Sequence, residues 1–420
     1  MLSHRVGRFG AAPEDLRGLR NRLARAKRAI VERSEAGEQG WLSCLDDAAM
    51  VKRIRDLVKK KAAYRTCLVI GIGGSDLAAR ALSKALKPGE KKLVFAGANT
   101  DPDELAGILS ELDLRKTLIN VISKSGDTVE PMATFLIVRD RLERRAGKRQ
   151  AANQIIATTD RESGSLRELA EREGYDTLPV PKNIGGRFSA LTDVGLFPLA
   201  YAGADMRGLL AGGRAQRDAF LRGKPEKNPT ALYAALQYLA YLKRRRIHVL
   251  MPYAERLREF AFWYRQLWAE SLGKKTDRRG NVVHVGPTPV AALGVTDQHS
   301  QLQLYVEGPN DKIITCIEVG TFDDDAALPD SVSDIPSLAY LKGKTLQDLI
   351  HAERKATVTA LARNKRPNGT VHLPNITAET MGELIVFFEL ATAMMGELLN
   401  INAYHQPGVE EGKRLTKQYL

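Results

Sequence analysis

The sequence contains few cysteines, and their spacing forms no recognisable framework. Three occur in 420 residues, at Cys44, Cys67 and Cys316. None belongs to a Cys-x-x-Cys pair or has a histidine close by in the sequence, so neither a disulfide scaffold nor a zinc site is expected. Scattered single cysteines are typical of buried thiols in a reducing compartment. We therefore expect a cytoplasmic protein without a metal.

Long hydrophobic runs are also missing. The longest apolar stretch, Leu384–Leu399, contains Glu389 and Glu397 and is too short and too charged to cross a membrane. A buried helix explains it better. The first twenty residues contain no apolar segment typical of a signal peptide, and acidic residues begin at Glu14, which argues against a transit sequence. No membrane partner is expected.

Aromatic residues are scarce, whereas basic residues are in excess. The net charge of +13 would suit an anionic partner, but the basic residues lie in stretches of mixed sign, which are typical of solvated helix faces. A nucleic-acid groove needs stacking aromatic side chains, and these make up only 6% of the chain. We expect no nucleic-acid partner; a basic nucleic-acid-associated protein is the alternative, which salt-sensitive binding would reveal.

Short apolar runs alternate with amphipathic stretches, the pattern of parallel sheets covered by helices on both faces. A loose segment after Ala202, rich in glycine and charge, separates two series of runs. The predicted fold is α/β, with two doubly wound domains at 1–205 and 206–399 and a C-terminal helical tail at 400–420. Strands are predicted at 67–72, 93–97, 118–123, 154–159 and 177–180, and then at 247–251, 282–285, 313–319 and 371–373.

The first chemically informative segment is CLVIGIGGSDLAARAL, in which a strand ends in a glycine turn and a helix begins near Asp76. Free N–H groups at a helix start favour an anion. The segment fails the dinucleotide fingerprint because Asp76 takes the third glycine position after Gly71 and Gly73, and no GxxxxGK[ST] occurs in the chain. No cofactor is expected. A plain strand-to-helix connection capped by Ser75 is an equal interpretation.

The second segment, LINVISKSGDTVEPMATF, again places a polar loop between a strand and a helix. Ser123, Ser125 and Thr128 supply three hydroxyl groups within six residues, beside the free N–H groups of a helix start. This arrangement favours a phosphate. Asp127 is expected to face away, because its charge would repel the anion; a Ser/Thr-rich cap is the alternative.

Two further segments supply a cation and a carboxylate. In VPKNIGGRFSALTDVG, two glycines bring the main chain close to whatever Arg187 binds, which suits an oxyanion formed during a reaction. In FAFWYRQLWAESLGKKTDRRG, Gln266 and Glu270 lie four residues apart on one helix face among aromatic residues, where a carboxylate could act as a base. A surface salt bridge and an exposed helix glutamate are the simpler explanations.

The last two segments add a histidine and a lysine. In GVTDQHSQLQLYVEGPNDK, His299 lies in a polar cluster and could move protons between oxygens, although a loop histidine without function explains it as well. In GELLNINAYHQPGVEEGKRLTKQYL, Gln406 and Lys413 flank a Pro-Gly turn. A lysine at such a place is ordinarily solvated.

Taken in order, the motifs GIGGS, SKSGDT, GGRFS, QLWAESLGK, DQHSQ and QPGVEEGK resemble those of the phosphoglucose isomerase family, from about Leu68 to Lys413. Six modest motifs in one order rarely coincide by chance. The resemblance implies two sugar-isomerase (SIS) domains, a tail that returns to the active site, and a homodimer. It implies a glycolytic and gluconeogenic enzyme that interconverts glucose 6-phosphate and fructose 6-phosphate through a cis-enediol, without cofactor or metal.

The resemblance also assigns a role to each candidate residue. Glu270 would move the proton between C2 and C1, and Arg187 would stabilise the enediolate. His299, supplied by the other subunit, would open the sugar ring with the help of Lys413. The substrate would contact the remaining candidates, which are Gly74, Ser75, Ser123, Lys124, Ser125, Thr128, Glu130, Gln266 and Gln406.

Four positions depart from the family pattern. Lys182 stands where an acidic or polar residue is usual, Ala190 where a larger residue is usual, Asp193 where a small residue or proline is usual, and His405 where Asp or Asn is usual. The last could change substrate preference. Two alternatives stay open: an isomerase that acts also or mainly on mannose 6-phosphate, and a phosphosugar-sensing module of the same fold, which would need no base.

Overall fold

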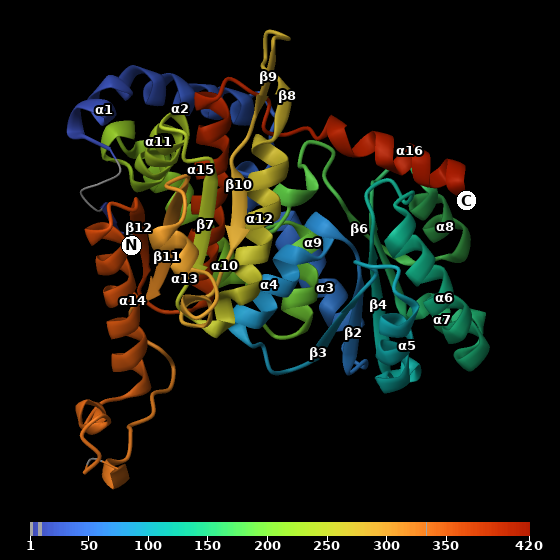
Figure 1. The fold of residues 1–420 in the computed structure, drawn as a ribbon. Helices are drawn as coiled ribbons and strands as arrows, with labels where there is room; N and C mark the ends of the chain where they lie inside the picture. The colour runs from blue at the N-terminus through green and yellow to red at the C-terminus, as the bar shows by residue number, and fades with distance from the viewer. Residues whose placement is uncertain (1–2, 7–10, 333) are drawn as a thin grey trace. The chain divides into compact units, whose positions relative to one another are not determined.

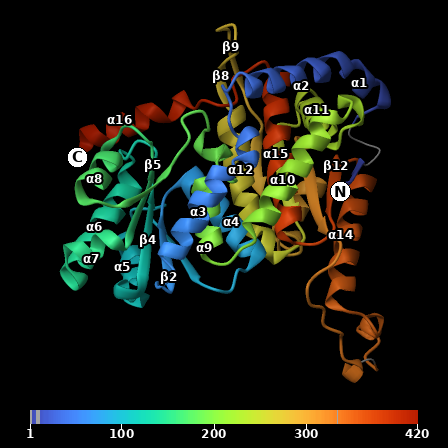
Figure 2. The same cartoon turned by 180° about the vertical axis from the view of Figure 1, so that it is seen from behind.

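The computed structural model describes residues 3–6, 11–332 and 334–420 (Figures 1 and 2). The chain divides into two compact units. Unit 1 contains Ala219–Thr380 and Phe387–Leu420 with the described part of the first 29 residues, and unit 2 contains Ile30–Asp218 and Met381–Val386. The units interleave along the sequence, whereas the predicted boundaries at 1–205 and 206–399 are continuous; those boundaries stay a prediction.

Unit 2 is built on a five-stranded sheet of order β3-β2-β4-β5-β6, in which every pair is parallel. Its central strand β4 is buried at all six positions, as a strand covered on both faces must be. All five strands predicted for the first series are confirmed to within two residues at each end. They are β2 (Thr66–Ile70), β3 (Lys92–Ala96), β4 (Thr117–Ile122), β5 (Ile155–Thr159) and β6 (Asp176–Pro179).

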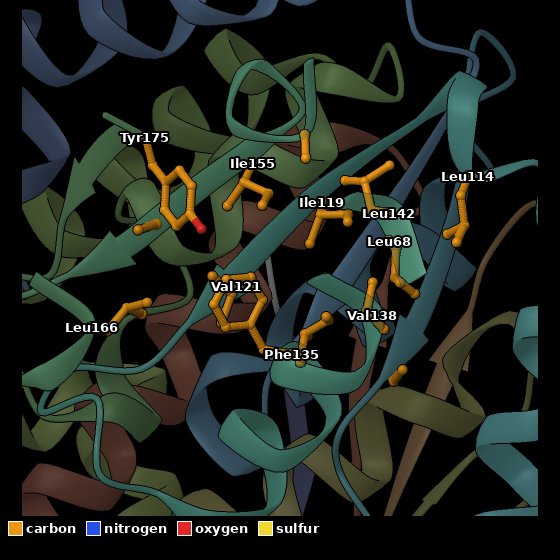
Figure 3. Packing of buried hydrophobic residues seen from close by; sticks show 14 of the residues in the cluster. Leu68, Leu114, Ile119, Val121, Phe135, Val138, Leu142, Ile155, Leu166 and Tyr175 are labelled. Atoms are coloured by element: carbon orange, nitrogen blue, oxygen red, sulfur yellow. The ribbon is translucent and has the colours of Figure 1, made fainter. Parts of the chain in front are cut away.

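One face of this sheet packs against four helices through a continuous apolar cluster (Figure 3). Phe135, Val138 and Leu142 project from one helix stripe toward Ile119 and Val121 of β4. Each such side chain contributes about 1.5–3 kcal/mol when fully buried. These helices are α5 (Pro102–Glu111), α6 (Val129–Ala146), α7 (Lys148–Asn153) and α8 (Ser165–Glu173). The other face is covered by α3 (Ala48–Lys60), α4 (Leu77–Leu86) and α9 (Asp193–Tyr201), of which α9 contacts both neighbours and β2.

Unit 1 contains a second five-stranded sheet, of order β1-β12-β11-β7-β10. Its pairs are parallel except at one edge, where β1 runs antiparallel to β12. The predicted strands near 247, 313 and 371 are confirmed. The strands are β1 (Ser3–Val6), β7 (Ile247–Pro252), β10 (Thr288–Ala291), β11 (Lys312–Val319) and β12 (Asn368–Leu373).

The strand predicted at 282–285 exists but belongs to a different sheet. It is β9 (Val282–Val285), which pairs antiparallel with β8 (Lys274–Thr276) in a separate hairpin with an exposed Val282. The edge of the parallel sheet is instead β10, which contains Pro289. Proline is tolerated at an edge because no ladder hydrogen bond is needed there. This strand was not predicted because its sequence is short and contains a proline.

The predicted buried helix is confirmed, and its residues belong to both units. That helix is α15 (Ala378–Leu398), where even Glu389 is only 2% exposed. Burial raises the pKa of the Glu389 carboxyl well above its usual value. The other long helices are α2 (Arg20–Glu35), α11 (Pro229–Leu242), α12 (Arg258–Leu272), α14 (Leu346–Arg363) and the C-terminal α16 (Glu410–Tyr419).

The predicted fold class is confirmed: each unit has a parallel sheet with helices packed on it, and the chain ends in a helix. Within the described ranges, no helix combines the length and the apolar character needed to span a membrane.

Candidate active site

The strand order of unit 2 predicts the edge at which a ligand would bind. From β2 the chain proceeds to β3 on one side, whereas from β4 it proceeds to β5 on the other. Right-handed crossovers then place the helices that follow β2 and β4 on opposite faces, which opens a crevice beyond the carboxyl ends of these two strands. The two loops at this crevice are the GIGGS and SKSGDT motifs.

The GIGGS turn packs directly against the GGRFS turn. A Cβ on Gly74 would lie 2.1 Å from the carbonyl carbon of Gly186, so only glycine allows this approach. The hydroxyl of Ser189 donates to the Gly186 carbonyl at 2.6 Å and holds the second turn. The paired glycines were predicted to bring the main chain close to a ligand; what they approach here is another main chain. Arg187 and Ser75 therefore belong to one backbone cluster.

The helix after the GIGGS turn is not capped by Ser75. Its N-cap is Asp76, and α4 begins at Leu77. Asp76 is 2% exposed and forms an ion pair with Arg80 at 3.1 Å, which occupies the carboxylate that would otherwise cap the helix. The side chain of Ser75 is thus not used for capping, and it is partly exposed.

The SKSGDT loop holds its own shape through its serines. The Ser123 hydroxyl is buried and accepts a hydrogen bond from the Gly126 N–H at 3.1 Å, and the Ser125 hydroxyl accepts one from the Asp127 N–H at 3.2 Å. Thr128 is the N-cap of α6 but makes no capping bond through its side chain. Its hydroxyl and the first N–H groups of α6 are suited to bind an anion.

The charged residues of this loop point in different directions. Asp127 is exposed and accepts a hydrogen bond from the Ser165 hydroxyl at 2.6 Å, in agreement with the prediction that it faces outward. The Lys124 ammonium donates to the Lys182 carbonyl at 2.9 Å, which ties the loop to the segment that leads to Arg187. Partial burial lowers the pKa of Lys124. Glu130 lies in the first turn of α6 and is partly exposed.

Arg187 is buried within unit 2, with only 3% of its surface exposed. Its guanidinium lies 5.9 Å from the centre of the Phe188 ring. A buried guanidinium is a fixed cation with directed donors, which is what a developing oxyanion requires. Its burial argues against a surface salt bridge, and its role in the reaction stays a prediction.

Asp193 and Lys182, two of the departures from the family pattern, form ion pairs in the structure. Asp193 is 1% exposed and forms a bidentate ion pair with Arg53, with both distances 2.8 Å. Burial raises the pKa of Asp193, and the pairing with Arg53 opposes this shift. Lys182 is exposed and pairs with Glu162 at 2.6 Å. His405 is exposed.

In unit 1, the candidate base lies on α12 and is oriented by a neighbour one turn away. The Gln266 amide Nε2 donates to Glu270 Oε1 at 3.1 Å. The Gln266 Oε1 atom is buried and has no hydrogen-bond partner among the residues that the structure describes. A buried acceptor of this kind is normally satisfied by a hydroxyl or water donor.

The aromatic residues of α12 mostly serve the core. Trp263 and Trp268 are 1% and 0% exposed, and Trp268 stacks with Tyr264 at 5.4 Å. Glu270 is partly exposed. The tryptophans therefore anchor α12 in unit 1 and make it a rigid support for Gln266 and Glu270.

His299 lies at the opposite end of α12 from Glu270. It follows the carboxyl end of β10, in a short 3₁₀ turn whose Asp297 interacts electrostatically with Arg258, the first residue of α12. Glu270 lies twelve positions after Arg258 on this helix, and this length of helix corresponds to about 18 Å. Unit 1 does not bring His299 and Glu270 together. His299 is exposed, whereas its polar neighbour Gln298 is used structurally, donating to the Tyr253 hydroxyl at 3.0 Å.

The tail starts at the same end of unit 1 as Glu270. A hydrogen bond joins the hairpin that follows α12 to the residues just after α15. In it, the main-chain N–H of Arg278 donates to the carbonyl of Asn400 at 2.9 Å. Gln406 and Lys413 are exposed, and the Lys413 ammonium pairs with Glu410 at 2.8 Å. This pair lies within α16 and is the kind that contributes little to stability.

One residue beside the site was not predicted. Lys274 is almost fully buried at the end of α12, although lysine is rarely buried. The available signals were its place directly after a helix-ending glycine and at the end of the QLWAESLGK motif. No cluster of three or more metal-ligating side chains occurs within the described ranges.

Comparison with known proteins identifies the family. The family model for phosphoglucose isomerase matches residues 56–420. The chain is 42% identical to the glucose-6-phosphate isomerase of Carboxydothermus hydrogenoformans, over 98% of this chain and 91% of that protein. The crystal structure of a hypothetical protein from Thermus thermophilus superimposes with a TM-score of 0.92 at 37% identity, covering 100% of this chain and 99% of that one.

A more distant structure agrees at the level of the fold. The glucose-6-phosphate isomerase of Chlamydia trachomatis superimposes with a TM-score of 0.86 at 23% identity, covering 100% of this chain and 88% of that one. The full-length matches at high identity and the six ordered motifs agree. The chain belongs to the phosphoglucose isomerase family.

Proposed function

We propose that the chain catalyses the reversible isomerisation of glucose 6-phosphate and fructose 6-phosphate, as an enzyme of glycolysis and gluconeogenesis. The observation that carries the proposal is the oriented carboxylate of Glu270, held by Gln266 on a rigid helix beside an unsatisfied buried acceptor. A sensing module would need the phosphate loop but no such base. The names of its relatives support the same substrate.

The phosphate binds at the SKSGDT loop. The hydroxyls of Ser125 and Thr128 and the first N–H groups of α6 donate to its oxygens, while Ser123 holds the loop in shape. The Lys124 main chain belongs to the same loop. The sugar contacts Gly74 and Ser75 on the adjacent turn, and Glu130, Gln266 and Gln406 line the site.

Glu270 removes the proton from C2 of the open-chain aldose and returns it to C1, through a cis-enediol. Removal of a proton alpha to a carbonyl leaves negative charge on oxygen, so the reaction needs a cation that is already in place. Arg187 supplies that cation, since its burial in unit 2 fixes it before the reaction begins. Gln266 Oε1 accepts a hydrogen bond from a sugar hydroxyl.

Ring opening requires a proton to move between the ring oxygen and the C1 hydroxyl. His299 carries out this transfer with the assistance of Lys413. Because His299 lies near the start of α12, whereas Glu270 lies about 18 Å along that helix from Arg258, the histidine serves the site of a second copy of the chain. The active enzyme is therefore a homodimer with His299 donated across the interface, located in the cytoplasm and working without cofactor or metal.

Hydrogen exchange tests this mechanism. Fructose 6-phosphate is incubated with the purified protein in D₂O, and the product is analysed by NMR. Proton transfer through a partly exposed carboxylate predicts deuterium at C2 in part of the glucose 6-phosphate, because the carboxyl proton exchanges with solvent in a fraction of turnovers. Product without any deuterium would contradict a base that exchanges with solvent, and absence of product would refute the isomerase function itself.

A further inference from the structure

Helix α12 ends at a buried lysine whose charge is directed at the last carbonyls of the helix. Lys274 is 6% exposed. Its ammonium donates to the carbonyls of Glu270 at 2.5 Å, Ser271 at 2.9 Å and Gly273 at 3.3 Å. Three main-chain carbonyls thus accept hydrogen bonds from this ammonium group, which has three N–H donors.

These contacts act on the turn that contains the candidate base. The last carbonyls of a helix have no partner within the helix and concentrate the negative end of the helix dipole. Without a cation, this partial charge would repel the Glu270 carboxylate, which lies in the same turn. The shortest of the three contacts is to the carbonyl of Glu270 itself, so Lys274 also restrains the peptide that carries the carboxylate.

The lysine is itself held in place by the backbone around it. Lys274 begins β8 and pairs with Val285 of β9. A Cβ on Gly286 would lie 2.7 Å from the Cα of Gly273, so the hairpin packs backbone against backbone next to the helix end. The hairpin is further tied to α15 by the ion pair of Arg278 with Glu397. Lys274 thus connects a fixed hairpin to the last turn of α12.

We propose that Lys274 is a positioning residue for Glu270: its ammonium fixes the last turn of α12 and offsets the helix dipole beside the carboxylate that moves the proton. This inference rests on the proposed function. It concerns the chemical step rather than substrate affinity, because Lys274 holds the helix end through main-chain carbonyls. Small displacements of a reacting group can lower the rate by as much as about 10²-fold.

The test compares two adjacent lysines. Lys274→Met keeps the length of the side chain but removes its donors and charge, whereas Lys275→Met changes an exposed neighbour. We expect Lys274→Met to lower kcat roughly 10- to 50-fold with KM changed less than about twofold. Lys275→Met should leave both constants unchanged. Circular dichroism and thermal unfolding report whether each variant is folded.

The kinetic isotope effect on kcat distinguishes a misplaced Glu270 carboxylate from a smaller fraction of folded protein. With glucose 6-phosphate deuterated at C2, a misplaced base makes proton removal more rate-limiting, so Lys274→Met should show a larger isotope effect on kcat than the wild type. A variant that is merely less folded loses kcat with an unchanged isotope effect, and that result would overturn the proposal. So would a kcat of Lys274→Met within twofold of the wild type.

A second variant covers the case in which Lys274→Met does not fold. Lys274→Arg keeps the charge, but a planar guanidinium cannot direct three donors from one point at converging carbonyls. It should fold, lose about fivefold in kcat and show the same rise in isotope effect. Unchanged constants in this variant would also refute the proposal. An inactive wild type or an active Glu270→Gln would instead refute the proposed function, which keeps the two failures distinct.

Discussion

The separation of His299 and Glu270 leads to a complementation experiment. His299 follows the turn whose Asp297 interacts with Arg258 at the start of α12, whereas Glu270 lies about 18 Å further along that helix, so we expect one copy of unit 1 not to supply both to one site. In a two-fold dimer, each site would combine Glu270 of one chain with His299 of the other. Glu270→Gln and His299→Leu are made separately, co-expressed with different affinity tags, and the mixed dimer is isolated with both tags.

The expected activity follows from counting intact sites. In the mixed dimer, one site receives both substitutions and the other receives neither, so about half of the wild-type kcat should return. Each parent homodimer should be lower than the wild type by roughly 10²-fold, as expected for loss of a proton-transfer group. If both residues came from one chain, every site of the mixed dimer would contain one substitution. Activity no higher than that of the parents would therefore refute the reasoning.

Three further predictions concern single residues. Glu270→Gln should lower kcat by roughly 10² or more while sugar-phosphate affinity, measured by calorimetry, stays largely intact; retained turnover would remove Glu270 from its role. Arg187→Ala should lower kcat more than it raises KM, because the charge it meets forms mainly in the transition state; a pure KM effect would make it a binding residue. Arg53→Met should destabilise the protein by about 3 kcal/mol at pH 7 in urea unfolding, because it leaves the buried Asp193 carboxylate without its partner. Burial raises the pKa of Asp193, so the folded state takes up a proton more readily than the unfolded state, and this deficit should shrink as the pH falls toward 4. A deficit independent of pH would contradict that cause.

The strands of unit 2 were predictable because each is a short apolar run that must be buried on both faces. In unit 1 the same rule failed for one strand. The β-branched segment of β9 was recognisable as a strand, but its pairing with β8 depends on a hairpin that only the tertiary structure shows. The sheet edge β10 contains a proline, which weakens its strand signal.

The candidate site was predictable at the level of motifs but not of geometry. Hydroxyl groups and glycines at strand ends pointed to the SKSGDT and GIGGS loops, because these residue types have few other uses there. The contact of Gly74 with Gly186 joins segments more than 100 residues apart, and no local pattern encodes it. The same holds for the Asp193–Arg53 pair.

The most direct test of the account is the conversion of fructose 6-phosphate to glucose 6-phosphate by the purified protein. Product is followed with an NADP-dependent glucose-6-phosphate dehydrogenase, with EDTA present throughout and mannose 6-phosphate tested in parallel. The account predicts robust turnover that EDTA does not reduce. Phosphosugar binding without turnover would contradict it and would point to a sensing module of the same fold.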